Sequence, residues 1–432
     1  MTDAVSAGGA GATRSQVVCA GICALILTVG LARFSYTPLL PVMREDAGLS
    51  YLAGGWLATF NYVGYLSGAL IAANMADARR RYFVYRLGLI VAVLSTAAMG
   101  WTDDVGTWAL LRLVSGLSSA AGMLIASGLV LNWLMRNGYR AELGLHFTGL
   151  GLGIIVSGVA VNLMLGHLDW AQQWVALGVL GVAFLVPAWL WVPAPDPAPR
   201  AASRPAPGHS SKPASGSARR PAAGAASRSA PASAGTAAPH GPRAHAEAPP
   251  GRWMALLVGS YFCAGFGYVI SATFIVAILG KMPLLTGLGG WLWVAIGLAA
   301  VPSSLLWDRV AQGIGHMRAL GLGFGLQTIS ILLPALTEDP WLNLLSALLY
   351  GGTFIGLVSL TLALIGRRFP GNPSKAMAKL TISYGVAQIV APAIAGMIAA
   401  DTGSYRGALI LAVLVMGVGM LLVAALHMLE RR

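Results

Sequence analysis

The sequence predicts an all-α integral membrane protein whose twelve transmembrane helices form two six-helix, pseudo-symmetric halves. Of its 432 residues, 56% are hydrophobic and only 10% are charged, whereas soluble domains carry about 25% charged residues. Twelve apolar runs are each long enough to cross a bilayer, which takes about 20 residues. A long polar segment divides these runs six and six, and the basic residues gather on one predicted side of the membrane.

The twelve runs lie between short polar connections, and each run is predicted to be one membrane-spanning helix. Their approximate limits are 17–42, 52–76, 83–101, 107–135, 143–166, 171–192, 253–280, 288–307, 318–337, 341–366, 376–400 and 405–428.

The chain divides into five predicted regions. Two short cytoplasmic tails, 1–16 and 429–432, flank an N-terminal half over 17–192 and a C-terminal half over 252–428. Ala, Pro, Ser, Gly and Arg dominate the segment 193–251 between the halves. Because this composition cannot bury a core, the segment is expected to be a disordered basic linker on the cytoplasmic side.

The positions of the basic residues predict the orientation in the membrane. If the N-terminus is inside, 23 of the 28 Lys and Arg residues are cytoplasmic, three are outside, and Arg33 and Arg112 lie within helices. This bias is typical of a bacterial inner-membrane protein with both termini in the cytoplasm. It accounts for the net charge of +13 without nucleic acid as a partner, and it favours contact with anionic membrane lipid.

The two halves repeat each other at several points. The stretch from Gly30 to Pro38, which holds Arg33, aligns with the stretch from Gly265 to Thr273, which holds Tyr268. Trp56-Leu57 matches Trp291-Leu292, and Asp77 matches Asp308-Arg309. Parallel six-helix repeats with a substrate site near mid-membrane are the architecture of major facilitator transporters.

Two stretches carry a more specific resemblance. These are Arg33-Phe-Ser-Tyr-Thr-Pro-Leu-Leu-Pro41 and Gly55-Trp-Leu-Ala-Thr-Phe-Asn-Tyr-Val-Gly-Tyr65. The chain outside the linker resembles the major facilitator superfamily, and this pair is similar to the YbfB/YjiJ family of bacterial transporters. The resemblance implies secondary transport by rocking of the two halves, and it leaves the substrate undefined.

The loop after the second predicted helix is similar to a gating motif of the superfamily, G-x-x-x-D-R-x-G-R-R. Asp77 and the following Arg79 and Arg80 fit its acid and its trailing bases, but the motif's glycines and the arginine directly after the acid are missing. The resemblance implies an inner gate latch here and, by the repeat, at Asp308 and Arg309. The antiporter pattern G-x-x-x-G-P is incomplete, because Ile154 stands in place of the proline.

Arg33 and Arg112 are the foremost candidate site residues. An arginine at the centre of a membrane helix costs about 2.5–3.5 kcal/mol, and no Asp or Glu lies within a predicted helix to neutralise either one. Two cations in the outer half of the same six-helix unit are predicted to bind an anion. The alternative is that helix-end carbonyls and hydroxyl groups satisfy them, or that they reach the outer surface.

Four further residues are predicted to line a polar cavity supplied by both halves: Tyr36, Asn61, Tyr268 and Gln388. Tyr62 and Tyr65 lie on the same helix as Asn61. The alternative is ordinary hydrogen bonding between helices. His146 is predicted to be an interfacial histidine facing the cytoplasm, with a proton-handling role as the alternative.

Taken together, these features predict a monomeric, gradient-driven transporter of a small organic anion, with a proton as a possible co-substrate. The sequence lacks the G-x-x-x-x-G-K-[ST] motif and any cluster of metal-ligating residues, so neither enzyme activity, nor a cofactor, nor a metal is expected. One alternative is an exporter of amphipathic compounds or drugs. A second is a non-transporting membrane sensor that retains the fold.

Overall fold

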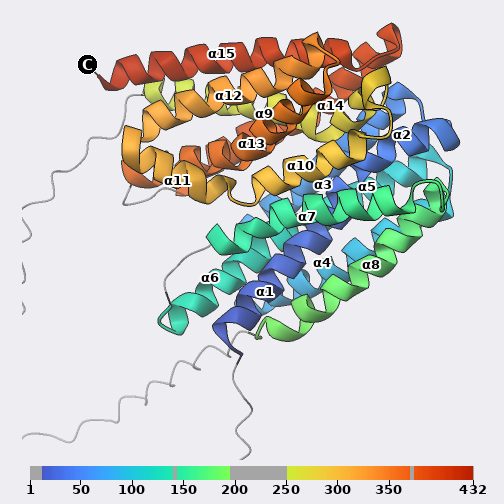
Figure 1. The fold of residues 1–432 in the computed structure, drawn as a ribbon. Coiled ribbons are helices and arrows are strands. Elements are labelled where there is room, and N and C mark those ends of the chain that lie inside the picture. Colours follow the sequence, from blue (N-terminus) through green and yellow to red (C-terminus); the bar gives the residue numbers. More distant parts are fainter. Residues whose placement is uncertain (1–11, 140–143, 195–250, 370–373, 432) are drawn as a thin grey trace, which may run out of the picture. The chain divides into compact units, whose positions relative to one another are not determined.

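The computed structural model describes residues 12–139, 144–194, 251–369 and 374–431 (Figure 1). Within these ranges the chain forms helices and no strands, which confirms the predicted all-α class. The predicted linker lies almost wholly outside the described residues, as does most of the predicted N-terminal tail.

The helices of the N-terminal half follow the six predicted spans. Their bounds are α1 Arg14–Leu25, η1 Ile26–Phe34, α2 Tyr36–Asp46, α3 Tyr51–Ala73, α4 Ala78–Ala98, η2 Met99–Trp101, α5 Val105–Ala120, η3 Ala121–Ala126, α6 Ser127–Arg136, α7 Gly144–Met164 and α8 Trp170–Trp191. The first span runs through α1, η1 and α2, and the fourth through α5, η3 and α6.

The helices of the C-terminal half follow the other six. Their bounds are α9 Gly251–Leu279, η4 Pro283–Leu285, α10 Gly289–Ala300, α11 Ser303–Ile314, α12 His316–Leu336, α13 Pro340–Arg368, α14 Ser374–Thr402 and α15 Arg406–Glu430. In the part of the chain that the structure describes, ten spans are long and apolar enough to cross a membrane, or eleven if α10 and α11 count as one. The remaining predicted span is α3, whose 23 residues reach across a bilayer but include Asn61, Tyr62 and Tyr65.

The eighth predicted span differs from the prediction in shape and length. It is bent by 47° between α10 and α11, where Pro302 precedes the first residue of α11. The helix then continues to Ile314 rather than stopping near residue 307. Asp308 therefore lies within a helix, on its exposed side, as do the exposed Glu45, Asp46, Asp401 and Glu430 near helix ends, which corrects the expectation that no acidic residue does so.

Several acidic residues in the short connections begin helices. Asp104, Asp169 and Asp339 are N-caps whose carboxylates accept a backbone N–H from the first turn of α5, α8 and α13. At α5, the side chain and backbone of Thr107 both donate to Asp104, at 2.7 and 2.6 Å. These hydrogen bonds lower the pKa of Asp104 below its ordinary value.

Glycines allow helices to approach closely both within the N-terminal half and between the two halves. Within the N-terminal half, Gly64 of α3 faces the carbonyl oxygen of Leu113, and Gly116 of α5 faces that of Asn61; a Cβ at either glycine would lie 2.0 Å from that oxygen. Between the halves, a Cβ on Gly55 would lie 2.8 Å from Cα of Gly396. Small residues at such crossings are the usual means of tight packing in membranes.

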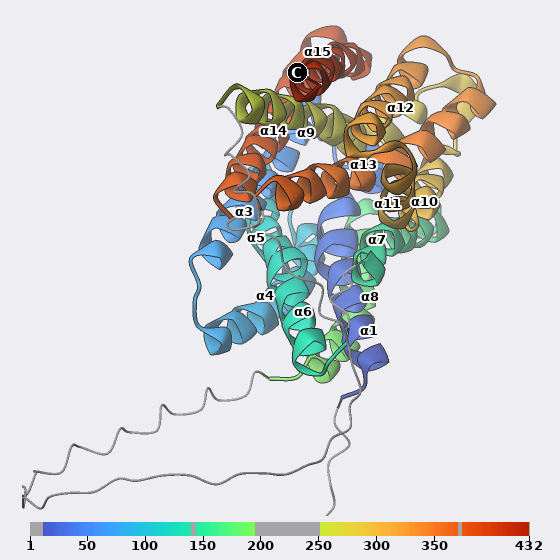
Figure 2. The ribbon, with the colours of Figure 1, turned by 90° about the vertical axis from the view of Figure 1, so that its left-hand side faces the viewer.

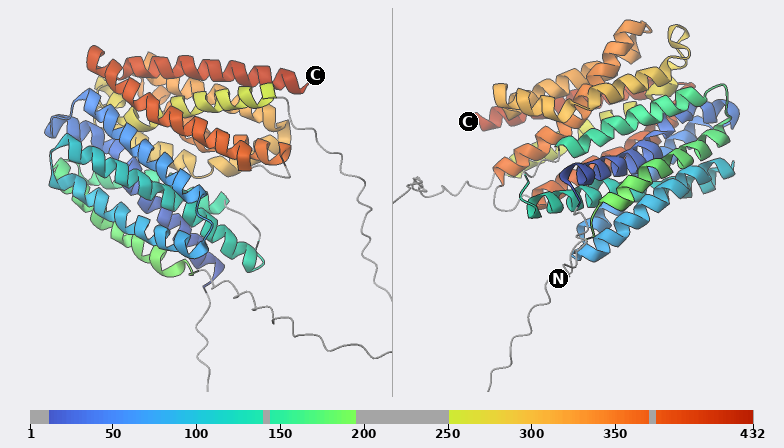
Figure 3. Two further views of the ribbon diagram at one scale, coloured as in Figure 1. Left: turned by 180° about the vertical axis from the view of Figure 1, so that it is seen from behind. Right: turned by 60° about the horizontal axis from the view of Figure 1, so that its bottom comes forward.

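The two ends of the helical unit differ. At the end of α2 and the start of α3, the halves are in contact, as seen from opposite sides in Figures 1 and 3. At the other end, where α1 begins and α15 ends (Figure 2), a cleft of about 520 Å³ separates α3 and α6 from α14. Leu66, Arg81, Leu129 and Thr381 are among its lining residues. The structure is therefore closed at one end and indented at the other.

Candidate functional site

The site is built around an irregular turn in the first span. Residues Ile26–Phe34 form a π-helix, in which the backbone N–H of Ser35 donates to the carbonyl of Gly30, five residues back. Side chains of α5 donate to carbonyls of this segment: Ser119 to Thr28 at 2.7 Å, and Ser115 to Ala32 at 2.6 Å. π-Helical segments within longer helices often occur at functional sites, and this nine-residue one holds Arg33.

Arg33 is 7% exposed and lies against aromatic rings. Its guanidinium carbon is 4.2 Å from the ring centroid of Tyr62 and 4.7 Å from that of Tyr65, both on α3. Its Nε atom is buried and has no hydrogen-bond partner among the described residues. No carboxylate within the same ranges pairs with it. A buried cation supported by ring faces, with donor capacity left over, is suited to an anion.

The C-terminal half contributes a set of stacked rings to the same place. Tyr268 of α9 interacts electrostatically with Arg33 and stacks on Phe354 and Tyr384, with centroids 5.3 and 6.0 Å apart. The ring centroids of Tyr261 and Tyr384 are 4.6 Å apart. We call Arg33 and its ring neighbours the Arg33 site; the rings are those of Tyr62, Tyr65, Tyr261, Tyr268, Tyr350, Phe354 and Tyr384.

Arg112, the second candidate cation, has backbone partners. It is 3% exposed and donates to the carbonyls of Ala32 and Arg33 at 3.1 and 3.4 Å. Its guanidinium carbon lies 4.5 Å from the ring centroid of Tyr36. These contacts are those expected if backbone carbonyls hold the arginine, and they connect Arg112 to the π-helix; its Nε atom, like that of Arg33, is buried without a partner among the described residues.

The other predicted polar residues separate into two groups. Tyr36 and Asn61 bond to neighbouring backbone: the Tyr36 hydroxyl donates to Gly54 at 2.9 Å, and Asn61 Nδ2 donates to Arg112 at 3.0 Å. Tyr268 belongs to the Arg33 site. Gln388 lies one helical turn after Tyr384, on the same face of α14, and its Oε1 atom is buried without a partner among the described residues.

Sequence reasoning missed four rings of the Arg33 site: Tyr261, Tyr350, Phe354 and Tyr384. A signal was present in their spacing. Tyr261 and Tyr268 are seven residues apart, and Tyr350 and Phe354 are four apart, so that each pair lies on one helix face. In a membrane helix, however, such a face is equally typical of packing against lipid or another helix.

His146 is buried rather than interfacial, which corrects the prediction. Its side chain is 0% exposed, and its Nε2 lies 2.8 Å from Oγ of Ser127. Because Ser127 donates its hydroxyl hydrogen to the carbonyl of Met123 at 2.6 Å, it accepts from His146. The imidazole is covered because Gly21 of α1 leaves room for it: a Cβ there would lie 2.3 Å from Nδ1.

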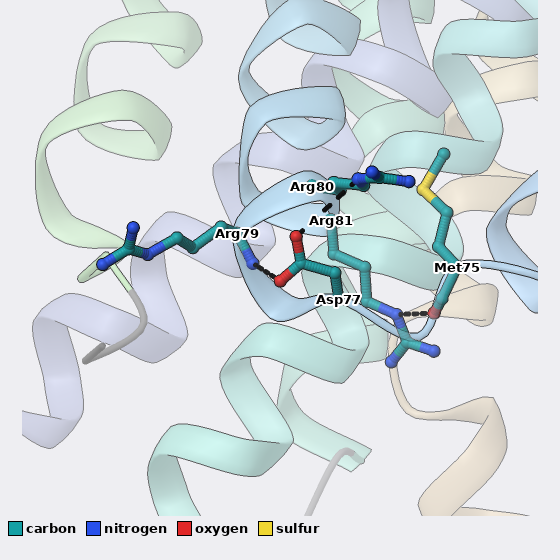
Figure 4. Close-up of polar contacts among 5 residues, drawn as sticks. All are labelled: Met75, Asp77, Arg79, Arg80 and Arg81. Carbon is teal, nitrogen blue, oxygen red and sulfur yellow. Dashed lines mark hydrogen bonds and ion pairs between the residues drawn. The ribbon is translucent and has the colours of Figure 1, made fainter. Parts of the chain in front are cut away.

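The predicted gating residues of the N-terminal half interact locally (Figure 4). Asp77 caps α4 by accepting from the backbone of Arg79 at 3.0 Å, and Nε of Arg80 lies 3.8 Å from its carboxylate. Arg81, outside the prediction, donates to the carbonyl of Met75 at 2.7 Å and lines the cleft. Asp308 and Arg309 are exposed on α11, without a hydrogen bond or ion pair to any described residue.

The closed end is held by residues that the sequence did not single out. Tyr51 of α3 receives a hydrogen bond on its hydroxyl from Lys281, and its ring centroid is 3.3 Å from the guanidinium carbon of Arg44. The Tyr405 hydroxyl donates to the carbonyl of Tyr51 at 3.4 Å. Below them, Thr37 donates to the carbonyl of Ala272. Each of these hydrogen bonds joins the two halves.

The fold and the central site between two helical halves define a transporter of the major facilitator class. Crystal structures of the nucleoside transporter NupG, one of them of a point mutant, share the fold, with TM-scores of 0.67 and 0.69 at 12% and 11% identity; they cover 97% and 96% of this chain and 99% of theirs. The family described as "Uncharacterised MFS-type transporter YbfB" matches residues 25–223 and 225–424. The chain belongs to this family, which confirms the resemblance seen in the sequence.

Two characterised relatives match part of the chain. A gallate transporter of Pseudomonas putida is 27% identical over 155 residues, or 36% of this chain and 34% of that protein. The niacin transporter NiaP of Acinetobacter baylyi is 26% identical over 145 residues, or 33% and 32%. The chain thus matches about a third of the length of each.

The contacts of Arg112 lead to a first prediction. In Arg112→Gln the shorter side chain loses both carbonyl partners; Ser115 still donates to the carbonyl of Ala32, but each lost hydrogen bond from a charged donor costs about 1.5–3 kcal/mol. We expect the apparent melting temperature of the purified protein to fall by several degrees, while substrate affinity in the surviving protein stays within about threefold of the wild type. Unchanged melting together with a large loss of affinity would instead place Arg112 at the ligand.

Proposed function

We propose that the protein is a gradient-driven transporter of the bacterial inner membrane that moves a small organic anion by alternating access. One observation carries this proposal: Arg33 is buried between the halves with an unused donor and with ring faces on several sides. In a low-dielectric site, a guanidinium gains most from a carboxylate, which it binds through two parallel hydrogen bonds. The closed end and the opposite cleft fit one state of the rocking cycle.

The rings of the Arg33 site favour an anion that is itself aromatic. Tyr268, Tyr350 and Phe354 lie nearly parallel, with interplanar angles of 4° between the two tyrosines and 21° between Tyr350 and Phe354. The planar ring of a ligand can stack beside these side chains or take the place of one of them. Each aromatic pair stabilises the complex by about 0.5–1.5 kcal/mol beyond the effect of burial. Gallate and niacin, the compounds after which the two relatives are named, both carry a carboxylic acid on an aromatic ring.

Orientation and coupling complete the proposal. The excess of Lys and Arg on one predicted side favours a cytoplasmic position for both termini, and therefore for the cleft. In this arrangement the structure corresponds to an inward-facing state. A proton that accompanies the anion would travel on the carboxyl group of the substrate or on His146, which is buried near the cleft end of α7.

Counterflow in proteoliposomes, with matched compounds, tests the proposal. We expect nicotinate and benzoate to exchange across the membrane, because each combines a carboxylate with a flat ring. Nicotinamide and benzamide keep the ring and lose the charge, and we expect them to exchange at least about tenfold more slowly, since one charge-assisted pair is worth more than about 1.4 kcal/mol. Equal exchange of the amides would end the proposal of an anion.

Cyclohexanecarboxylate separates the effect of a flat aromatic ring from the effect of the charge. It keeps the carboxylate but is puckered, so we expect slower exchange than benzoate. If it exchanges as fast as benzoate, the substrate is a small organic anion without a need for an aromatic ring. If only cationic or amphipathic compounds exchange, the protein is an exporter of that class instead.

A further inference from the structure

A second basic site lies away from the Arg33 site, at the end of the C-terminal half that carries the chain terminus. A cavity of about 750 Å³ opens there among the ends of α11, α12, α13 and α15. Five basic side chains line it: His316, Arg318, Arg367, His427 and Arg431. We call it the α12 pocket. No residue of the Arg33 site lines it.

The positive charge of the α12 pocket is only partly neutralised: Glu430 lines it, and Asp308 of α11 acts electrostatically on His316, against three arginines. Glu430, the one acidic lining residue, accepts a hydrogen bond from Trp253 at 3.0 Å. Within the described ranges, the side chains of Arg318, Arg367 and Arg431 form no ion pair and donate no hydrogen bond. Nδ1 of His427 is buried and also has no partner there. Three unpaired guanidinium groups around one cavity attract a multivalent oxyanion such as phosphate.

The backbone adds to this attraction. The 21-residue helix α12 starts in the pocket, with Gly315 as its N-cap at φ 88° and without a side-chain cap from any described residue. Gly315, His316, Met317 and Arg318 all line the cavity. The unpaired N–H groups of a first helical turn, with the positive end of the helix dipole, bind phosphate groups in many proteins.

The walls of the cavity distinguish a lipid from a free ion. Ile314 and Leu364 line it together with the charged groups, and Ile314 is 42% exposed. A pocket at the membrane border with basic groups at one level and aliphatic walls beside them matches a phospholipid, whose phosphate lies next to its acyl chains. A dissolved phosphate ion would gain nothing from the aliphatic wall.

We propose that the α12 pocket binds the phosphate group of an anionic membrane phospholipid. Arg318 and Arg367 contact the phosphate from α12 and α13, and the start of α12 supplies backbone N–H donors. The bound lipid links the ends of α12 and α13, so it stabilises the C-terminal half without entering the Arg33 site.

Native mass spectrometry of the purified full-length protein tests this, with phosphatidylglycerol, phosphatidylcholine and inorganic phosphate as probes. We expect phosphatidylglycerol to bind at least about tenfold more tightly than phosphatidylcholine, and the doubly substituted Arg318→Gln/Arg367→Gln protein to lose this preference. Arg368→Gln is the matched control, because Arg368 is an exposed neighbour on the same helix that does not line the cavity.

Three outcomes would overturn the proposal. Equal binding of the two lipids to the wild type would remove the anionic site. An unchanged preference in the double variant would move the site elsewhere on the surface. Binding of inorganic phosphate with the same sensitivity to Arg318→Gln/Arg367→Gln, but without preference for the lipid, would make the ligand a free anion. If the double variant does not fold, the single variants Arg318→Gln and Arg367→Gln give the same comparison.

Discussion

Replacing Arg33 by glutamine weakens binding of an anionic substrate by roughly 30-fold or more, because removing one partner of a buried charge pair costs about 2–5 kcal/mol. The protein still inserts, since loss of the charge lowers the cost of placing this helix in the membrane. Arg33→Lys restores binding only in part, because an ammonium group lacks the planar fork that matches a carboxylate. Equilibrium binding of an anionic substrate to the purified wild-type, Arg33→Gln and Arg33→Lys proteins measures the three affinities.

Arg86 offers a matched control for this experiment. Its guanidinium carbon also lies over aromatic rings, 4.3 Å from the ring centroid of Trp189 and 4.7 Å from that of Tyr82, but it belongs to α4 and is not part of the Arg33 site. Arg86→Gln therefore removes a similar cation–π contact and leaves affinity unchanged. If Arg33→Gln lowers the melting temperature and leaves affinity unchanged, Arg33 has a structural role, and the anion site lies elsewhere.

Replacing Gly55 by leucine prevents the closed end from forming. A Cβ at this position would lie 2.5 Å from the carbonyl oxygen of Pro392 and 2.8 Å from Cα of Gly396. Both are backbone atoms of α14, which cannot move aside as a side chain can. The halves must therefore separate at this end, and we expect transport to fall at least about tenfold, because the state shown here becomes a minor one.

Accessibility of the interface measures this shift. Thr37 is 2% exposed between the halves, so a Thr37→Cys protein, with its three native cysteines replaced, reacts slowly with a membrane-impermeant maleimide. Adding Gly55→Leu should raise the labelling rate about tenfold or more. Gly417→Leu is the control, since nothing lies within 4 Å of its Cβ position. Equal labelling with and without Gly55→Leu would show that this contact does not hold the end closed.

The fold could be predicted in detail because each membrane span is fixed by local composition. The predicted limits 83–101 and 171–192 agree with Ala78–Trp101 and Trp170–Trp191 to within a few residues. The bend in the eighth span was missed because hydropathy is continuous across Pro302. Its extension was missed because Asp308 and Arg309 are polar and yet lie on an exposed face of α11.

The candidate site was predictable only where one residue was anomalous by itself. Arg33 stood out as a charge in an apolar run, and the internal repeat pointed to Tyr268 as its counterpart. The roles of Arg112 and His146 depend on atoms of other helices: the carbonyls that the π-helix presents to α5, and the space that Gly21 leaves. No local pattern reports such contacts, so sequence reasoning treated the two arginines as equivalent.

The π-helical turn also bears on how the length of this chain can change. A connection at the membrane surface can gain or lose a residue without moving a span, whereas Arg33 lies inside one. Each residue of an α-helix turns the chain by about 100°, so deleting one residue between 26 and 34 would convert the π-turn to an α-turn and rotate Arg33 away from Tyr62 and Tyr65. A single-residue deletion in this stretch, ahead of Arg33, would thus redirect the site while the span remained intact.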